Sequence, residues 1–105
     1  MGNQDLVLYT TFEDFYPFYL KEHSNRTNRR LHFVGTSLGL LSLAYFFFTG
    51  QFKLLFVPFL CGYGFAWVGH FFFQKNKPAT FKYPLFSLRG DFKMWFSMLT
   101  GKIKI

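Results

Sequence analysis

Two long apolar runs dominate the pattern of hydrophobic and polar positions along the chain. The run from Leu54 to Phe73 contains twenty residues without a formal charge, and a helix of that length rises about 30 Å, the thickness of a bilayer's hydrocarbon core. The run from Phe33 to Thr49 contains seventeen uncharged residues. Residues 50–53 leave room only for a tight turn. The pattern therefore predicts two membrane-spanning helices, at about residues 32–50 and 53–73, paired as an antiparallel hairpin.

Two shorter segments with one apolar face flank these runs. The first follows Thr11, a suitable N-cap, and its apolar residues recur at helical spacing: Phe12, Phe15, Tyr16, Tyr19 and Leu20. The second shows the same spacing: Leu88, Phe92, Trp95, Phe96 and Leu99. We expect amphipathic helices at about residues 12–23 and 87–100, lying along the membrane surface or across the bundle. Residues 1–105 are thus predicted to form a single all-α integral-membrane domain.

Charge and composition agree with this interpretation. The chain has a net charge of +7 and includes eighteen Phe, six Tyr and two Trp, a loading that suits a protein solvated by lipid. Its basic residues flank the apolar runs, and only Lys53 lies in the turn between them. This distribution argues against nucleic acid as a partner and predicts both termini in the cytoplasm. The host membrane would be the endoplasmic reticulum in a eukaryote or the inner membrane in a bacterium.

Two histidines lie at equal distances from the centre of the turn. His32 precedes Gln51 by nineteen residues and His70 follows it by nineteen, so the two rings should reach the same depth on neighbouring helices. A histidine at the edge of a lipid-buried helix is costly unless it faces protein, water or a metal. The pair therefore indicates either a metal or catalytic site or an interhelical hydrogen bond without chemistry. His23 is a third candidate, but it needs a break in the helix around residues 24–28 to fold back.

Small residues on the same helical faces support a close contact between the two spans. They lie one and two turns from the histidines: Gly35, Thr36 and Gly39 after His32, and Ala66 and Gly62 before His70. Such stripes let membrane helices approach closely, so both imidazoles should point into one seam.

The remaining candidates each allow two interpretations. Arg26, Arg29 and Arg30 could anchor the first span to lipid phosphates or could bind a substrate carboxylate. Asp91 could be an ordinary first-turn partner of a helix dipole or could reach a metal.

The segments with the histidines resemble the small membrane proteins of the 2-hydroxy-fatty-acid dioxygenase family, known from phytosphingosine breakdown. The similarity covers roughly residues 12–100 and rests on HSNRTNRRLHFVG, GHFFFQKNKPAT and YPLFSLRGDF. It implies an iron(II)-dependent enzyme that uses dioxygen to shorten a 2-hydroxy fatty acid by one carbon. Gln74 departs from the pattern, because an acid is expected four residues after the GH pair.

His23, His32 and His70 match the histidine positions of the family, so the resemblance implies that they bind the iron. The residues themselves suggest Asp91 as a further catalytic residue of such a site. The candidates for substrate binding lie at the start of the first span: Arg26, Asn28, Arg29 and Arg30. Because histidines bind metal only when neutral, metal occupancy is expected to fall below about pH 6.

Two other functions fit the same residues. A haem protein could use paired histidines at one depth. A structural or lipid-binding membrane protein would use them only for hydrogen bonds between helices. Homo-oligomerisation is left open by the sequence.

Overall fold

Every regular element that the computed structural model describes, over residues 8–105, is a helix. The predicted all-α class is confirmed for this range, and residues 1–7 of the predicted domain lie outside the described residues. The four α-helices are α1 (Phe12–Lys21), α2 (Arg26–Phe48), α3 (Val57–Val68) and α4 (Pro84–Leu99). The shorter helical segments are the 3₁₀ turns η2 (Phe52–Leu54) and η4 (Ala79–Phe81) and the π-helix η3 (Gly69–Gln74).

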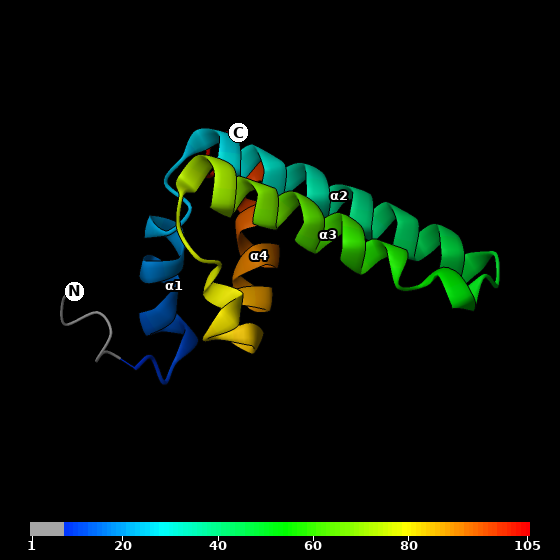
Figure 1. Ribbon diagram of the computed structural model, residues 1–105, viewed down its shortest axis with the longest axis horizontal. Coiled ribbons are helices and arrows are strands. Elements are labelled where there is room, and N and C mark those ends of the chain that lie inside the picture. The colour runs from blue at the N-terminus through cyan, green and yellow to red at the C-terminus, as the bar shows by residue number, and fades with distance from the viewer. Residues whose placement is uncertain (1–7) are drawn as a thin grey trace.

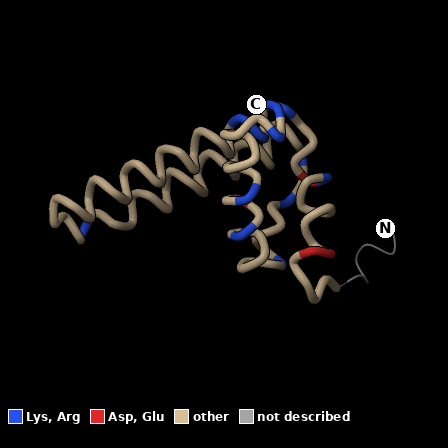
Figure 2. Tube along the Cα trace, turned by 180° about the vertical axis from the view of Figure 1, so that it is seen from behind, with Lys and Arg blue, Asp and Glu red and all other residues tan. Residues whose placement is uncertain are grey.

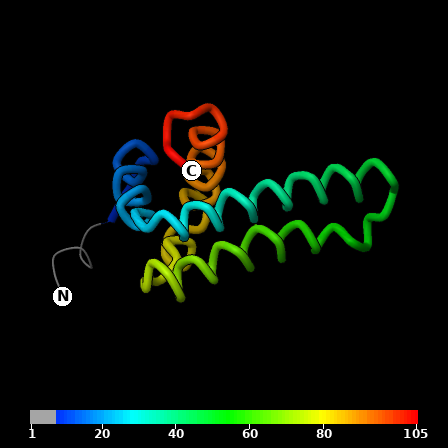
Figure 3. Tube along the Cα trace, turned by 90° about the horizontal axis from the view of Figure 1, so that it is seen from above, coloured from blue at the N-terminus to red at the C-terminus, as the bar shows by residue number. Residues whose placement is uncertain are grey.

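Helices α2 and α3 lie side by side and are joined by a turn at the far end of the pair (Figures 1 and 3). Gly50 in this turn has a φ of 73°, in the left-handed region that glycine adopts without strain. The segments Arg26–Phe48 and Phe52–Gln74 are each 23 residues long and apolar enough to cross a membrane. Only 17% and 22% of their apolar stretches are buried inside the structure, whereas a core helix of a soluble protein is mostly buried. Most of their apolar surface is therefore left for an environment outside the chain.

Glycines of α2 form the close contact with α3. A Cβ added at Gly35 would lie 2.8 Å from Cβ of Phe65 and 2.9 Å from the carbonyl oxygen of Cys61. A Cβ at Gly39 would lie 3.0 Å from the carbonyl oxygen of Pro58. Only glycine therefore lets the two backbones approach at these points, as the small-residue pattern predicts.

Gly62 takes part in this contact through its backbone, as predicted. Its carbonyl oxygen would lie 3.2 Å from a Cβ at Gly35 and its nitrogen 3.9 Å from a Cβ at Gly39. A Cβ added at Gly62 itself would meet nothing within 4 Å, because that side of α3 borders a cavity.

Helices α1 and α4 lie beside one end of the α2–α3 pair and run across its direction (Figure 1). Their shared core is built from aromatic and methionine side chains: Phe12, Phe15, Tyr19, Met94 and Met98. Gly90 brings α4 against the ring of Tyr19, since a Cβ there would lie 2.9 Å from that ring. The indole nitrogen of Trp95 donates to Oγ of Ser37 at 2.9 Å and so joins α4 to α2. These contacts fix α4 against both α1 and the helix pair.

Capping residues set the starts of α1 and α2. Thr11 Oγ1 accepts a hydrogen bond from the backbone nitrogen of Asp14 at 3.2 Å, as predicted. Asn25 Oδ1 accepts one from the backbone nitrogen of Asn28 at 3.0 Å, so α2 begins at Arg26, earlier than the predicted span. The chain turns at residues 22–25, and this turn is the break that folds His23 back toward α2.

Candidate metal centre

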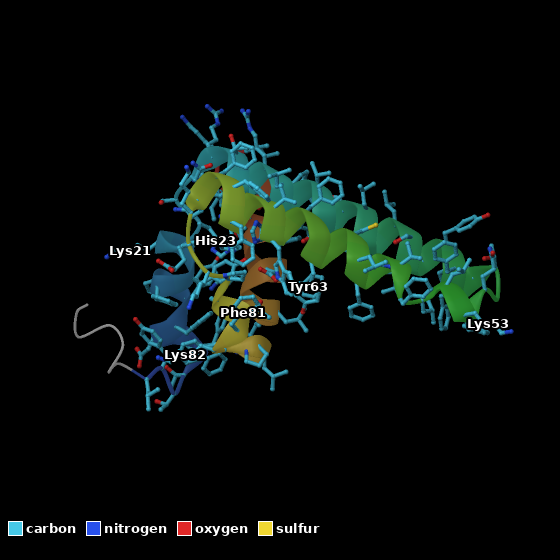
Figure 4. The ribbon with its side chains drawn as sticks, in the orientation of Figure 1. Lys21, His23, Lys53, Tyr63, Phe81 and Lys82 are labelled. Carbon is cyan, nitrogen blue, oxygen red and sulfur yellow. The ribbon has the colours of Figure 1, made fainter. Side chains whose placement is uncertain are left out.

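Three histidines from three separate elements meet at the end of the α2–α3 pair nearest to α1. His23 lies in the turn after α1, His32 in α2 and His70 in η3, and all three are buried. The ring centroid of His23 lies 4.4 Å from that of His32 and 4.5 Å from that of His70. The centroids of His32 and His70 are 4.8 Å apart. Figure 4 shows His23 at this end of the molecule and Lys53 at the opposite end. His32 and His70 thus lie together, as their equal spacing from the turn predicts.

Each ring is oriented by an oxygen atom at Nδ1. The distances are 2.6 Å from His23 to the carbonyl oxygen of Tyr19, 2.9 Å from His32 to that of Asn28, and 2.7 Å from His70 to Oδ1 of Asn76. A neutral imidazole has a single N–H, and an oxygen acceptor at Nδ1 places the proton there. All three Nε2 atoms are therefore left with a free lone pair.

The three Nε2 atoms converge on one point. That of His23 lies 3.1 Å from Nε2 of His32 and 3.0 Å from Nε2 of His70, and the ligand atoms all lie within 4.8 Å of one another. Lone pairs that face each other at such distances repel unless a cation lies between them. Two nitrogens bound to one metal ion at about 2.1 Å lie about 3.0 Å apart at a right angle and about 3.4 Å apart at a tetrahedral angle. The two separations from His23 match the right-angled case.

Burial, followed by the neighbouring His32 and His70, lowers the pKa of His23 well below its usual value. The unfolded chain would protonate this ring below about pH 6.5, whereas the folded protein keeps it neutral. The stability of the metal-free protein should therefore fall as the pH drops below that value. At the same time, the folded site should stay ready to bind metal at lower pH than a free imidazole.

We therefore expect the bound metal to be retained at about pH 6 and to be half lost only at a lower pH. The sequence already predicts that occupancy falls below about pH 6, from the ordinary pKa of histidine, and burial of His23 moves the expected half loss further below that pH. Metal content measured after dialysis across this range tests it. Half loss at or above about pH 6.5 would contradict it.

Asp91 is connected to the histidines through Tyr19. The hydroxyl of Tyr19 donates to the Asp91 carboxylate, and its ring stacks on that of His23 with centroids 4.0 Å apart. Burial raises the pKa of Asp91 to about 7, although the hydrogen bond from Tyr19 opposes this shift. Because α4 begins at Pro84, Asp91 lies about two turns inside the helix. The interpretation of Asp91 as a first-turn partner of the helix dipole is therefore wrong.

The π-helix η3 and the residues after it position His70. The backbone nitrogen of Asn76 donates to the carbonyl oxygen of His70 at 3.0 Å, while its side-chain oxygen holds Nδ1 of the same residue. Nδ2 of Asn76 donates to the carbonyl oxygen of Glu22 at 3.1 Å, in the turn that carries His23. The Asn76 amide thus links the segments that carry His23 and His70, and π-helical turns are frequent at functional sites.

Gln74 joins the same two segments from the other side. Its Oε1 accepts from the backbone nitrogen of Asn25 at 2.7 Å and from Nδ2 of Asn28 at 3.2 Å. Its Nε2 donates to Oγ of Ser24 at 2.8 Å. These hydrogen bonds occupy both ends of the amide, so Gln74 ties η3 to the start of α2.

The residues predicted to bind substrate lie around the start of α2. Arg26 and Arg30 are exposed, and Arg29 donates to the carbonyl oxygen of His23 at 3.3 Å. Asn28 is fully buried. None of the four lines either of the two cavities beside the histidines. Their role in substrate binding stays a prediction.

Three polar residues at the site were missed by the sequence reasoning: Tyr19, Asn76 and Ser87. Ser87 is buried and its hydroxyl has no hydrogen-bond partner, yet it lines a small cavity together with the three histidines and Asp91. Its position four residues before Asp91 places both on one face of α4, which was the available signal. Tyr19 was predicted only as part of an apolar stripe. The contact between Asn76 and His70 depends on the π-helical winding of η3, which the sequence spacing does not indicate.

Comparison with known proteins agrees with these features. The family model of 2-hydroxy-palmitic acid dioxygenase Mpo1-like proteins matches residues 9–103, a range that includes the histidines and Asp91. No curated protein and no solved structure matches the chain. The family match confirms the resemblance seen in the sequence motifs. The chain therefore belongs to the 2-hydroxy-palmitic acid dioxygenase Mpo1-like family.

Proposed function

We propose that the protein is a membrane-bound, iron(II)-dependent dioxygenase that converts 2-hydroxy fatty acids into fatty acids one carbon shorter. The observation that carries this proposal is the convergence of three imidazole lone pairs, each fixed by an oxygen at Nδ1. The family to which the chain belongs supports this class of reaction and substrate. Right-angled nitrogen ligands suit an iron site that keeps positions open for other ligands.

The overall reaction balances without a further reductant. A 2-hydroxy acid and one molecule of dioxygen contain the atoms of the shortened acid, carbon dioxide and water. The bond between the carboxyl carbon and the hydroxyl-bearing carbon breaks, both carbons are oxidised, and dioxygen is reduced. His23, His32 and His70 would hold the iron, which would supply the redox chemistry with dioxygen.

The other residues of the small cavity act on the polar end of the substrate. With a pKa of about 7, Asp91 can take a proton from the substrate hydroxyl near neutral pH. Tyr19 holds this carboxylate by its hydroxyl and supports the His23 ring from behind. The unpaired hydroxyl of Ser87 can donate to the substrate carboxylate. Burial of the site limits the access of water to these groups.

The geometry favours this proposal over a haem protein. Two axial histidines of a haem lie on opposite faces of the iron, about 4 Å apart. The Nε2 separations of 3.0 and 3.1 Å are shorter and leave no room for a macrocycle. A purely structural role would leave three lone pairs in mutual repulsion.

Reconstitution tests the proposal. Protein purified in mild detergent and stripped with a chelator should be inactive, and iron(II) should restore formation of the shortened acid from 2-hydroxypalmitic acid in air. Zinc(II) is the control, since it binds imidazoles but has no redox chemistry. Shortened acid and consumed dioxygen should appear in equal amounts. Equal activity with zinc, or no activity with any metal, would contradict the proposal.

The proposed topology places α2 and the helix formed by α3 and η3 across a bilayer, with both termini of the chain on the cytoplasmic side and the turn between α2 and α3 on the other side. Figure 2 shows Lys and Arg gathered over the end with α1, α4 and the C-terminus, whereas Lys53 lies at the opposite tip (Figure 4). Helix α4 exposes apolar side chains at helical spacing: Leu85, Leu88, Phe92, Phe96 and Leu99. We place it at the membrane surface with this face toward lipid.

Cysteine labelling in sealed, inside-out vesicles should report this topology. The native Cys61 is first replaced by alanine, because it is the free cysteine of the described chain. A cysteine at Lys75 should then react with a membrane-impermeant maleimide, and a cysteine at Gln51 should react only after the vesicles are opened. Reaction of both in intact vesicles would contradict the hairpin arrangement.

A further inference from the structure

A second cavity continues from the histidines into the corner between the α2–α3 pair and α4. It measures about 120 Å³ and is partly open to the outside. His32, Tyr63, Ala66 and Asp91 line both this cavity and the small one beside the three histidines, so the two spaces are adjacent.

The cavity is polar at one end and apolar at the other. Away from the histidines it is bordered mainly by apolar side chains of three helices, including Leu40, Leu43, Pro58, Phe59, Leu88 and Phe92. Phe59 is 63% exposed and Phe92 43%, so the rim of the groove faces the surroundings of the helix pair. In the proposed topology these surroundings are lipid.

The dimensions of the groove suit an aliphatic chain. His32 and Leu43 are eleven residues apart in α2, which corresponds to a rise of about 16 Å. An extended chain advances about 1.2 Å per bond, so this length takes about thirteen carbon–carbon bonds. This number is close to the number of carbon–carbon bonds in the tail beyond the hydroxyl-bearing carbon of 2-hydroxypalmitic acid.

We propose that this groove binds the aliphatic tail of the substrate and that its far end, at Leu43 and Pro58, sets the preferred chain length. The inference rests on the proposed function, since it takes the head of the same substrate to lie at the histidines. The tail would enter sideways from the bilayer along the open rim, so that the substrate need not leave the membrane.

Gly62 is the residue that keeps the middle of the groove open. It lines the groove, and a Cβ there would meet no atom within 4 Å, so a larger side chain would fill the groove without straining the backbone. Gly64 provides a matched control. It lies on the same helix, a Cβ there also meets nothing within 4 Å, and it does not line the groove.

The experiment compares iron-loaded wild type, Gly62→Leu and Gly64→Leu in lipid nanodiscs. The probe is 2-hydroxypalmitic acid with a diazirine near its methyl end, and cross-linked peptides are mapped by mass spectrometry. We expect labelling around residues 40–43 and 58–59 that unlabelled 2-hydroxypalmitic acid removes. Gly62→Leu should lower this labelling about tenfold or more, because its side chain displaces several methylenes, while Gly64→Leu should match the wild type.

Turnover of 2-hydroxypalmitic and 2-hydroxyoctanoic acids is measured in parallel. Gly62→Leu should lose activity on the long acid more than on the short one, at unchanged iron content. If Gly62→Leu does not fold, Leu43→Trp narrows the far end from α2 and should give the same selective loss.

The outcomes separate the two proposals. Labelling that no competitor removes, or an unchanged chain-length preference in the folded groove variant, overturns the groove. Competable labelling at these positions without any shortened acid supports the groove and overturns the dioxygenase.

Discussion

Replacement of His32 or His70 by alanine should remove nearly all bound iron and lower formation of the shortened acid at least about 100-fold. Loss of partners that only orient a ligand typically costs 10-fold to 100-fold in metal affinity or activity, and loss of a ligand itself should cost more. Nε2 of His32 lies 3.1 Å from Nε2 of His23, and Nε2 of His70 lies 3.0 Å from it. Each ring therefore supplies one of the three lone pairs that would hold the ion. The remaining two cannot hold the ion in the same geometry. His23→Ala should have the same effect, because its ring is in contact with both others.

Iron content by elemental analysis and product by mass spectrometry measure this result. Leu41→Ala is the control on the same helix, because Leu41 is 68% exposed and far from the rings in sequence. Membrane insertion should be unchanged in all variants. Full activity in a protein that lacks both His32 and His70 would exclude this site as the catalytic centre.

Gly35→Leu should separate α2 from α3 and lower iron binding about tenfold or more. A Cβ at this position would already lie 2.8 and 2.9 Å from atoms of α3, one of them a backbone oxygen that cannot rotate away. Overpacking typically costs about 1–3 kcal/mol, and here the movement occurs one turn from His32, so it acts on the metal ligands as well.

Thermal unfolding in detergent and iron affinity measure the effect of this change. Gly64→Leu is the matched control, because the same side chain there meets no atom within 4 Å of its Cβ. Equal unfolding temperatures and iron affinities for the two variants would show that the helices do not depend on this contact.

The sequence predicted the meeting of the histidines better than the residues that orient them. Equal distances from a short turn are enough to place His32 and His70 at one depth, because helix rise is constant. Helical spacing does not fix which side of a small residue stays open. Gly62 lies in the helix contact through its backbone, as expected, but it also borders the groove, which the sequence did not indicate.

The contacts of α1 and α4 could not be predicted from periodicity. An apolar stripe shows that a helix has a buried or lipid-facing side, but not which element it meets. The hydrogen bond from Tyr19 to Asp91 joins residues 72 positions apart in the chain. The start of α4 was also predicted too late, which gave Asp91 a first-turn role that it does not have.

The π-helical winding of η3 makes the length of this segment part of the metal site. Removing one residue between His70 and Asn76 would let α3 continue as an ordinary α-helix and carry the amide about 100° around the axis. The amide would then leave both the His70 ring and the turn that holds His23. The exposed residues Phe71, Phe72 and Phe73 can therefore be exchanged for one another or for other apolar residues, whereas their number cannot change. An insertion or a deletion in this segment would therefore remove the hydrogen bond that orients the His70 ring.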